Sequence, residues 1–280
     1  MLDARHANST ECQRTISVLR RLPSFDEALA RLLFLVEYRR PCGVVMGLGG
    51  TGKSALMEAV RQELATDACT PIPVDLRTTL SNSVPWSIAT GMGLSPASHA
   101  AVESIWLSIE DRAEGAASAG TSYVPLFDHI EQADADTLAI VARCCHLFAR
   151  TQGTVLLSGR PPLPQELTTL VRSLCDLRIE LPPWNAAETA YFIMQRQEED
   201  AIVQYGESAV AAIHEHSKGR LRDVQQLCRM TTFAAEAQGI ETIDAELIDS
   251  IASEIWRPVT QPHEVPAIAP TSLELATFSQ

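Results

Sequence analysis

The most informative segment is Gly47-Leu48-Gly49-Gly50-Thr51-Gly52-Lys53-Ser54. It matches the pattern G-x-x-x-x-G-K-[ST], in which the backbone N–H groups of a glycine-rich loop surround phosphate oxygens. An apolar segment at residues 42–46 precedes it and is typical of a buried parallel strand. Residues 54–64 follow with apolar side chains four apart, as on one face of a helix. The alternative is a glycine-rich turn that binds nothing, but the flanking strand and helix favour a phosphate-binding P-loop.

The residue types of this loop suit a nucleoside triphosphate. Glycines at 47, 49, 50 and 52 let the backbone approach phosphate oxygens that a Cβ atom would obstruct. Lys53 supplies a point charge for the β- and γ-phosphates, and the Ser54 hydroxyl is suited to ligating Mg²⁺. The following helix directs the positive end of its dipole at the same anion. We therefore expect all eight residues of this segment to contribute to a site for a nucleotide and Mg²⁺.

Length and charge limit the possible functions. A chain of 280 residues is long enough for one large domain, or for a medium domain and a small one. Its formal net charge of −13 argues against a surface that holds nucleic acid without specificity, although it leaves room for a local basic patch. The seven cysteines include no C-x-x-C pair, so neither a zinc site nor a disulfide framework is expected. Free thiols in a reducing cytosol are the simpler interpretation.

No segment predicts a membrane span. The stretch from Met1 to Arg21 is polar and lacks the apolar core of a secretory signal. A run of about 18 apolar residues, which a spanning helix needs, does not occur. We therefore expect a cytoplasmic protein that meets any membrane through a partner.

Strands and helices alternate as far as residue 182. Apolar runs predict strands at residues 42–46, 70–76, 123–128, 153–160 and 177–181, with helices between them. This alternation predicts an α/β fold with a doubly wound parallel sheet and helices on both faces. Pro71 and Pro73 fit best at the start of a strand or in an edge strand, whereas Pro125 is awkward in a central strand. A helix at residues 25–38 precedes the first strand, with Ser24 as its N-cap.

The pattern changes to helices alone after Pro182-Pro183. Helices are predicted at residues 187–197, 207–217, 222–237 and 244–256, which indicates a small all-helical lid domain. We therefore expect four regions along the chain. They are an N-terminal extension at 1–23, loosely ordered before a short helix, a P-loop core at 24–182, the lid at 183–256 and a proline-rich flexible tail at 257–280.

The order of these features resembles that of AAA+ ATPases: a P-loop, a strand ending in Asp, a strand ending in a polar residue, and a helical lid. Within that class the chain resembles the bacterial ExeA/GspA-type secretion ATPases and the related TnsC/MuB-type transposition ATPases. The resemblance covers residues 24–256 and includes the helix before the first strand. Residues 178–193 are similar to the family passage R-I-x-L-x-P-L…E-x-x-x-Y-I, and residues 213–228 to the lid segment G-x-P-R-x-[IV]-x-x-L-C. The resemblance implies a P-loop NTPase fold that binds ATP with Mg²⁺.

The resemblance also implies roles for three residues outside the P-loop. Asp128 ends an apolar strand and corresponds to the Walker B carboxylate, which meets Mg²⁺ through water; capping a helix is the alternative. Ser158 resembles the sensor 1 residue, whose hydroxyl orients the attacking water or touches the γ-phosphate; a merely polar strand end is the alternative. Arg222 resembles the sensor 2 arginine, which closes the lid on the γ-phosphate; an exposed helix arginine is the alternative.

An arginine finger for a neighbouring subunit is expected close to the last strand, where this class often presents one. Arg172 is the candidate, and Arg160 and Arg178 compete with it. Because a finger acts on a neighbour, the resemblance also implies a homo-oligomer.

One position departs from the family pattern. The residue after the Walker B Asp is usually Glu, the base that polarises the attacking water, and here it is His129. A neutral imidazole is able to act as a base near pH 7. Glu131 is a substitute if the strand end is shifted. If neither serves, the chain uses ATP binding as a switch and hydrolyses ATP slowly or not at all.

Three functions remain open from the sequence. The first is an ATPase that assembles or remodels a protein complex, as in the secretion type, whose partner is a membrane-associated complex. The second is an ATP-dependent DNA-binding regulator of the transposition type, and the third is a nucleotide switch that never hydrolyses ATP. The acidic balance and the absence of a Lys/Arg-rich stretch favour the first over the second, so nucleic acid is the less expected partner.

Overall fold

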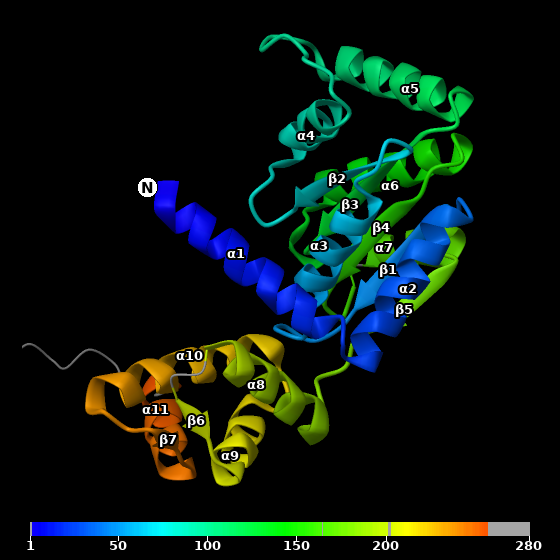
Figure 1. Cartoon of the computed structure of the whole chain (residues 1–280). Coiled ribbons are helices and arrows are strands. Elements are labelled where there is room, and N and C mark those ends of the chain that lie inside the picture. Colours follow the sequence, from blue (N-terminus) through cyan, green and yellow to red (C-terminus); the bar gives the residue numbers. More distant parts are fainter. Residues whose placement is uncertain (1, 164, 201–202, 257–280) are drawn as a thin grey trace, which may run out of the picture.

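Five parallel strands form the central sheet of the computed structural model, in the order β2-β3-β4-β1-β5 (Figure 1). The structure describes residues 2–163, 165–200 and 203–256. Each strand lies where the sequence predicts one, within a residue or two at its ends. The strands are β1 (Cys42–Met46), β2 (Cys69–Asp75), β3 (Ser122–Asp128), β4 (Val155–Gly159) and β5 (Leu177–Glu180).

Helices cover both faces of this sheet, because its strands are apolar on both sides. Val45 of β1 belongs to one hydrophobic cluster, together with α2 and α3. Its neighbours Val44 and Met46 belong to a second cluster on the opposite face, with α4, α5, α6 and α7. The elements of this part are α1 (Leu2–Leu19), α2 (Pro23–Glu37), α3 (Lys53–Leu64), η1 (Ser81–Ser83), α4 (Val84–Gly91), α5 (Val102–Ser118), η2 (Ile130–Gln132), α6 (Ala135–Arg150) and α7 (Gln165–Leu174).

The three prolines in the strands of the sheet lie where the missing N–H group removes few hydrogen bonds between strands. β2, which carries Pro71 and Pro73, is an edge strand, one of the two placements expected for these prolines. Pro125 lies inside β3, a central strand. The ladder between β3 and β4 consists of Leu126 and Phe127, directly after this proline. The sheet therefore accommodates Pro125 by beginning that ladder one residue later.

Helices also make up the C-terminal part. They are α8 (Ala186–Asp200), α9 (Glu207–Ser217), α10 (Leu221–Gln238) and α11 (Ala245–Ile255). A two-stranded parallel sheet of β6 (Gln204–Tyr205) and β7 (Thr242–Ile243) lies among them. This small sheet is not predicted, since strands of two residues are too short to show a period. The predicted fold class is confirmed, whereas the domain limits stay a prediction and the tail at 257–280 lies outside the described residues.

The N-terminal extension is helical over a longer stretch than the expected short helix after a loosely ordered start. It forms the helix α1, 18 residues long, whose C-terminal half buries Ile16, Val18 and Leu19. Polar contacts hold α1 and the turn after it to both parts of the molecule: Arg20, directly after α1, pairs with Glu63 of α3, and Glu11 lies 3.8 Å from Arg196 of α8. In Figure 1 the helix runs between the sheet and the helical region. Tertiary packing therefore stabilises a helix whose sequence is only weakly amphipathic.

The start of α2 also corrects a prediction. This helix begins at Pro23, and Leu22, not Ser24, is its N-cap. Proline at the first helical position explains the earlier start, because its fixed φ suits the helix and its missing N–H costs nothing there. The Ser24 hydroxyl instead donates a hydrogen bond to Glu188 of α8 at 2.5 Å.

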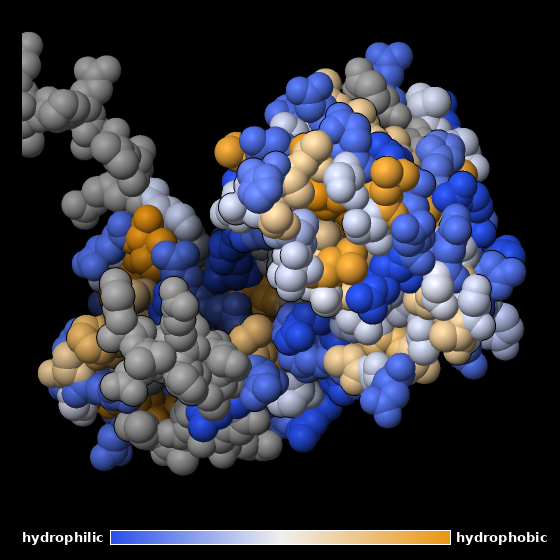
Figure 2. Space-filling view, turned by 90° about the horizontal axis from the view of Figure 1, so that it is seen from above, coloured by the Kyte–Doolittle hydropathy of each residue, from blue (hydrophilic) through white to orange (hydrophobic). Residues whose placement is uncertain are grey.

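The helical region is attached to the P-loop, because the N–H of Arg222 at the start of α10 donates a hydrogen bond to the carbonyl oxygen of Gly50 at 3.1 Å. The segment between β5 and α8 makes two further backbone bonds. The N–H of Leu181 donates to the carbonyl oxygen of Met46, the last residue of β1, at 2.7 Å, and that of Trp184 donates to the carbonyl oxygen of Gly219, before α10, at 2.9 Å. Figure 2 shows a recess with hydrophilic walls between the two lobes of the molecule. Among the described residues, no helix has the length and apolar composition that crossing a membrane requires.

Candidate nucleotide-binding site

The P-loop connects β1 to α3 at the carboxyl edge of the sheet. Gly50 and Gly52 have φ angles of 84° and 100°, which side chains disfavour. A Cβ atom on Gly47 would lie 2.5 Å from the carbonyl oxygen of Leu181. Because α3 begins at Lys53, the loop ends at a helix N-terminus, where free N–H groups and the helix dipole attract an anion.

The Lys53 side chain folds back over this loop. Its Nζ donates hydrogen bonds to the carbonyl oxygens of Gly47 at 2.9 Å and Leu48 at 2.7 Å. Only 8% of the residue is exposed. Burial lowers the pKa of Lys53, with the nearby charges of Arg160 and Arg222 acting in the same direction and those of Glu131 and Asp128 against it. The ammonium group is thus held at the loop where phosphate oxygens would lie.

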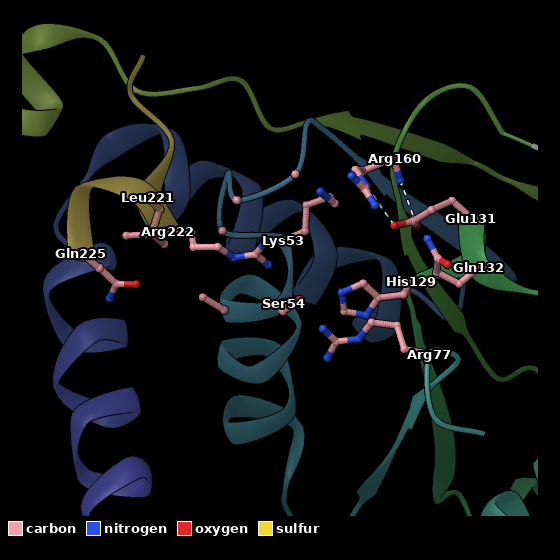
Figure 3. Close-up of a pocket in the computed structure, with 14 residues that line it drawn as sticks. Lys53, Ser54, Arg77, His129, Glu131, Gln132, Arg160, Leu221, Arg222 and Gln225 are labelled. Carbon is pink, nitrogen blue, oxygen red and sulfur yellow. Dashed lines mark hydrogen bonds and ion pairs between the residues drawn. The ribbon is translucent and has the colours of Figure 1, made fainter. Parts of the chain in front are cut away.

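A cavity of about 290 Å³ opens beside the loop (Figure 3). This volume is close to the lower end of ligand pockets, about 300–1,000 Å³. Its walls come from the P-loop, from the segments that follow β2, β3 and β4, and from the start of α10. The lining residues are Gly49, Gly50, Gly52, Lys53, Ser54, Ala55, Arg77, His129, Glu131, Gln132, Arg160, Leu221, Arg222 and Gln225.

Asp128 and Ser54 lie close enough to share a smaller cavity of about 140 Å³ between α3 and the strands β2 and β3. Together they offer a hydroxyl and a carboxylate oxygen. This donor set fits Mg²⁺, which takes one or two protein oxygens and completes its shell with water and phosphate. Within the described part of the chain, no cluster of three or more His, Cys, Asp or Glu side chains forms a closed metal site.

Ser158 lies behind Asp128 and not on the wall of the larger cavity. The residue is fully buried in β4, and its hydroxyl donates a hydrogen bond to Oδ1 of Asp128. The same oxygen accepts the N–H of His129 at 2.9 Å. Ser158 is therefore placed to orient the Asp128 carboxylate, and its predicted contact with a γ-phosphate stays a prediction.

His129 follows β3 with a φ of 63°, a left-handed conformation that turns the chain after the strand. Its ring lies on the cavity wall. The Nδ1 atom lies 3.3 Å from Oδ2 of Asp128 and 3.3 Å from Oδ1 of Asp75, the last residue of β2. Two carboxylates therefore flank one ring nitrogen on the side away from the cavity.

Glu131 also lines the cavity, but its carboxylate is already paired. Oε2 accepts the backbone N–H of Arg160 at 3.1 Å, and Oε1 accepts Nε of the same residue at 3.2 Å. Burial raises the pKa of Glu131, but hydrogen bonds from its own backbone and from Arg160 outweigh this, so the net pKa is lowered. Glu131 is an ionised carboxylate that holds Arg160 in place.

The predicted arginines divide into two groups. Arg222 and Arg160 line the cavity, from the start of α10 and from the end of β4 respectively. Arg172 on α7 and Arg178 on β5 are exposed and do not line it. The role of Arg172 as a finger for a neighbouring subunit stays a prediction.

A second cavity, of about 350 Å³, continues from the first. It shares Ser54, Ala55, Leu221 and Gln225 with the first cavity, and α1 forms its outer wall. Gln225 on α10 donates to the Thr15 hydroxyl of α1 at 3.1 Å. Neither Thr15 nor Gln225 is predicted from the sequence, because the N-terminal segment carries no motif and α1 reaches the site only through packing.

Solved structures with the same fold include the Orc1 protein of Aeropyrum pernix in complex with DNA, at 21% identity and a TM-score of 0.66. The alignment covers 86% of this chain and 67% of that one. For the Cdc6p protein of Pyrobaculum aerophilum the values are 15% identity, TM-score 0.64, and coverage of 81% and 65%. Domain III of the replication initiation protein DnaA of Thermotoga maritima has 12% identity and a TM-score of 0.60, and the alignment covers 88% of this chain and 98% of that domain.

These similarities establish the fold as that of AAA+ P-loop NTPases. The chain spans about two thirds of the Orc1 and Cdc6p structures. No protein-family model and no curated protein matches the sequence. The AAA+ part of the predicted resemblance is therefore confirmed at the level of fold, and its ExeA/GspA type is not.

Proposed function

We propose that the chain binds ATP with Mg²⁺ in the cavity beside the P-loop and acts as an AAA+ ATPase. The observation that carries this proposal is the P-loop at the N-terminus of α3, with Lys53 folded over it and Arg160 and Arg222 facing the same space. A triphosphate along this loop meets backbone N–H groups and three cationic side chains. The base then lies in the second cavity, against α1.

Ser54 and Asp128 would hold the magnesium ion, the hydroxyl directly and the carboxylate through water. When bound, Mg²⁺ supplies charge neutralisation for the β- and γ-phosphates. Ser158 keeps the Asp128 carboxylate oriented for this task through its hydrogen bond.

His129 is the better candidate to orient the attacking water. Both oxygens of Glu131 are engaged by Arg160, whereas the His129 ring lies on the cavity wall. The carboxylates of Asp75 and Asp128 flank Nδ1, which favours a hydrogen on that nitrogen and leaves Nε2 as the acceptor. The runner-up is a nucleotide switch without hydrolysis, which the absence of the usual Glu after Asp128 favours.

We propose further that ATP drives the assembly or remodelling of a protein complex by a cytoplasmic homo-oligomer, as in the ExeA/GspA type. The net charge of −13 supports a protein partner over nucleic acid. A DNA-binding regulator is the second candidate, because the Orc1 protein of the same fold was solved in complex with DNA. Titration of labelled duplex DNA at about 150 mM salt, with and without ATP, separates the two. Tight binding there contradicts the first candidate.

The lysine content of the chain makes nucleotide binding directly testable. Lys53 and Lys218 are its two lysines. An acyl-phosphate derivative of ATP transfers its acyl group to a lysine amine near the bound phosphates and releases ATP. We expect transfer to Lys53 and its suppression by excess ATP, because burial lowers the pKa of Lys53 and so raises the share of free amine. Lys218, exposed at the end of α9, is the internal control. Equal labelling of both lysines, unaffected by ATP, contradicts the proposal.

A further inference from the structure

Arg77 is a cation of the cavity that the P-loop motifs do not include. It follows β2 and is held by Asp75 through several contacts. Its Nε lies 3.1 Å from Oδ1 and 3.2 Å from Oδ2 of Asp75, and its Nη2 lies 2.6 Å from Oδ2. The backbone N–H of Arg77 adds a further bond to Oδ1 at 3.0 Å. The guanidinium is thus fixed in orientation although half of the side chain is exposed.

These contacts leave one edge of the guanidinium for another acceptor. Asp75 accepts from Nε and Nη2, and Nη1 makes no hydrogen bond to any described residue. The Asp75 hydrogen bond raises the pKa of Arg77, so the group stays charged. An arginine held in this way presents a preformed fork to an anion, with little further loss of side-chain freedom on binding.

The place of Arg77 in the cavity indicates which anion it meets. Figure 3 shows Arg77 beside His129 and Ser54, across the cavity from Arg222 and Gln225 on the lid side. The P-loop and the N-terminus of α3 would surround the inner phosphates of a nucleotide bound at the proposed site. The ends of β2 and β3 lie beyond Ser54, where a triphosphate would have its terminal group.

We propose that Arg77 binds the terminal phosphate of the nucleotide from within the same chain and makes the site prefer a triphosphate to a diphosphate. This inference rests on the proposed nucleotide site and names a residue that distinguishes a bound triphosphate from a bound diphosphate. Asp75 is the positioning residue: it holds the fork and at the same time lies 3.3 Å from Nδ1 of His129. Recognition of the terminal phosphate and orientation of His129 therefore share one carboxylate.

The test compares the affinities for Mg²⁺ with ADP and for Mg²⁺ with the non-hydrolysable β,γ-imido analogue of ATP, by calorimetry on the full chain. Arg77→Gln is expected to weaken the binding of the triphosphate analogue roughly 10- to 100-fold, as for a lost charge-assisted hydrogen bond. The affinity for ADP is expected to change less than about threefold. Arg77→Lys keeps the charge but not the forked guanidinium, and its affinity for the triphosphate analogue is expected to lie between those of the wild type and Arg77→Gln. Arg31→Gln is the matched control, since Arg31 pairs with Glu27 on the exposed face of α2.

The outcomes separate this inference from the proposed function. A wild type that binds neither nucleotide contradicts both. A wild type that binds both, with an Arg77→Gln variant that keeps the same ratio of the two affinities, contradicts the role of Arg77 alone. Sedimentation identifies conditions in which the protein is monomeric. If Arg77→Gln no longer weakens binding of the triphosphate analogue under those conditions, the result contradicts action of Arg77 within its own chain. Thermal unfolding of each variant confirms that the exposed substitutions leave the fold intact.

Discussion

The backbone N–H of Arg222 donates a hydrogen bond to the carbonyl oxygen of Gly50 at 3.1 Å. The first turn of α10 is therefore attached directly to the P-loop, and the Arg222 side chain faces the cavity. A second contact of the same kind joins Trp184, just after β5, to Gly219, just before α10. The first contact holds the start of α10 at the nucleotide site, and the second holds the turn before α10 against the segment that leads from β5 to α8.

Gly219→Ala is predicted to destabilise this attachment. Gly219 has a φ of 71°, and a Cβ atom there would lie 2.0 Å from the carbonyl oxygen of Trp184. We expect the free energy of unfolding to fall by about 2 kcal/mol or more, from backbone strain and the clash together. Chemical denaturation measures this change.

Gly239→Ala is the matched control. Gly239 ends α10 with a φ of 68°, but a Cβ atom there meets nothing within 4 Å. Only the cost of the left-handed conformation remains, about 1 kcal/mol. Equal effects of the two substitutions would show that the contact with Trp184 does not hold the helical region.

His129→Ala is predicted to lower ATP hydrolysis while sparing ATP binding. Loss of a group that orients or deprotonates the attacking water reduces the rate roughly 100-fold or more. Phosphate release and nucleotide affinity, measured on the same preparation, distinguish the two effects. Glu131→Ala is the comparison: a greater loss of hydrolysis there would transfer the role of the base to Glu131.

The pH dependence of stability provides a separate test of the Glu131–Arg160 pair. The net pKa of Glu131 in the folded chain lies below its ordinary value of 4.5, so the unfolded chain binds more protons as the pH falls. The stabilisation by Glu131 is present above pH 4.5 and is lost as the pH falls through the lowered pKa. Unfolding measurements between neutral and acid pH should show a shallower loss in Glu131→Gln than in wild type.

Glu27→Gln is the control for this pH effect, because Glu27 pairs with Arg31 on the exposed face of α2. Surface pairs of this kind contribute little to stability. Its pH profile should follow that of the wild type. A profile of Glu131→Gln that also follows the wild type would contradict the stabilising role of the pair between Glu131 and the half-exposed Arg160.

Much of the fold is predictable because it depends on local patterns. The central strands β1 and β4 are apolar runs buried on both faces. The P-loop combines characteristic residue types with a strand and a helix that are visible in the sequence. The edge position of β2 agrees with one of the two placements expected for Pro71 and Pro73. The similarity to solved structures of the AAA+ fold confirms the predicted fold class.

The rest of the site depends on which segments meet in space. Arg77 and Gln225 carry no motif, and they face the cavity only because β2 ends beside β3 and α10 begins over the P-loop. The helix α1 is stabilised by contacts with α3 and α8, which its own sequence does not reveal. Ser158 occurs where a polar strand end is predicted, but only the structure shows that its hydroxyl binds Asp128.

The most direct test of the central claim is Mg²⁺-dependent ATP binding by wild type and Lys53→Ala, measured by calorimetry. Lys53 is buried at the loop and faces the phosphate site, so its loss should weaken ATP binding roughly 100-fold without unfolding the chain. Tight binding by the wild type together with that loss supports a P-loop nucleotide site. A wild type that does not bind ATP, or a Lys53→Ala variant that binds ATP equally well, would contradict it.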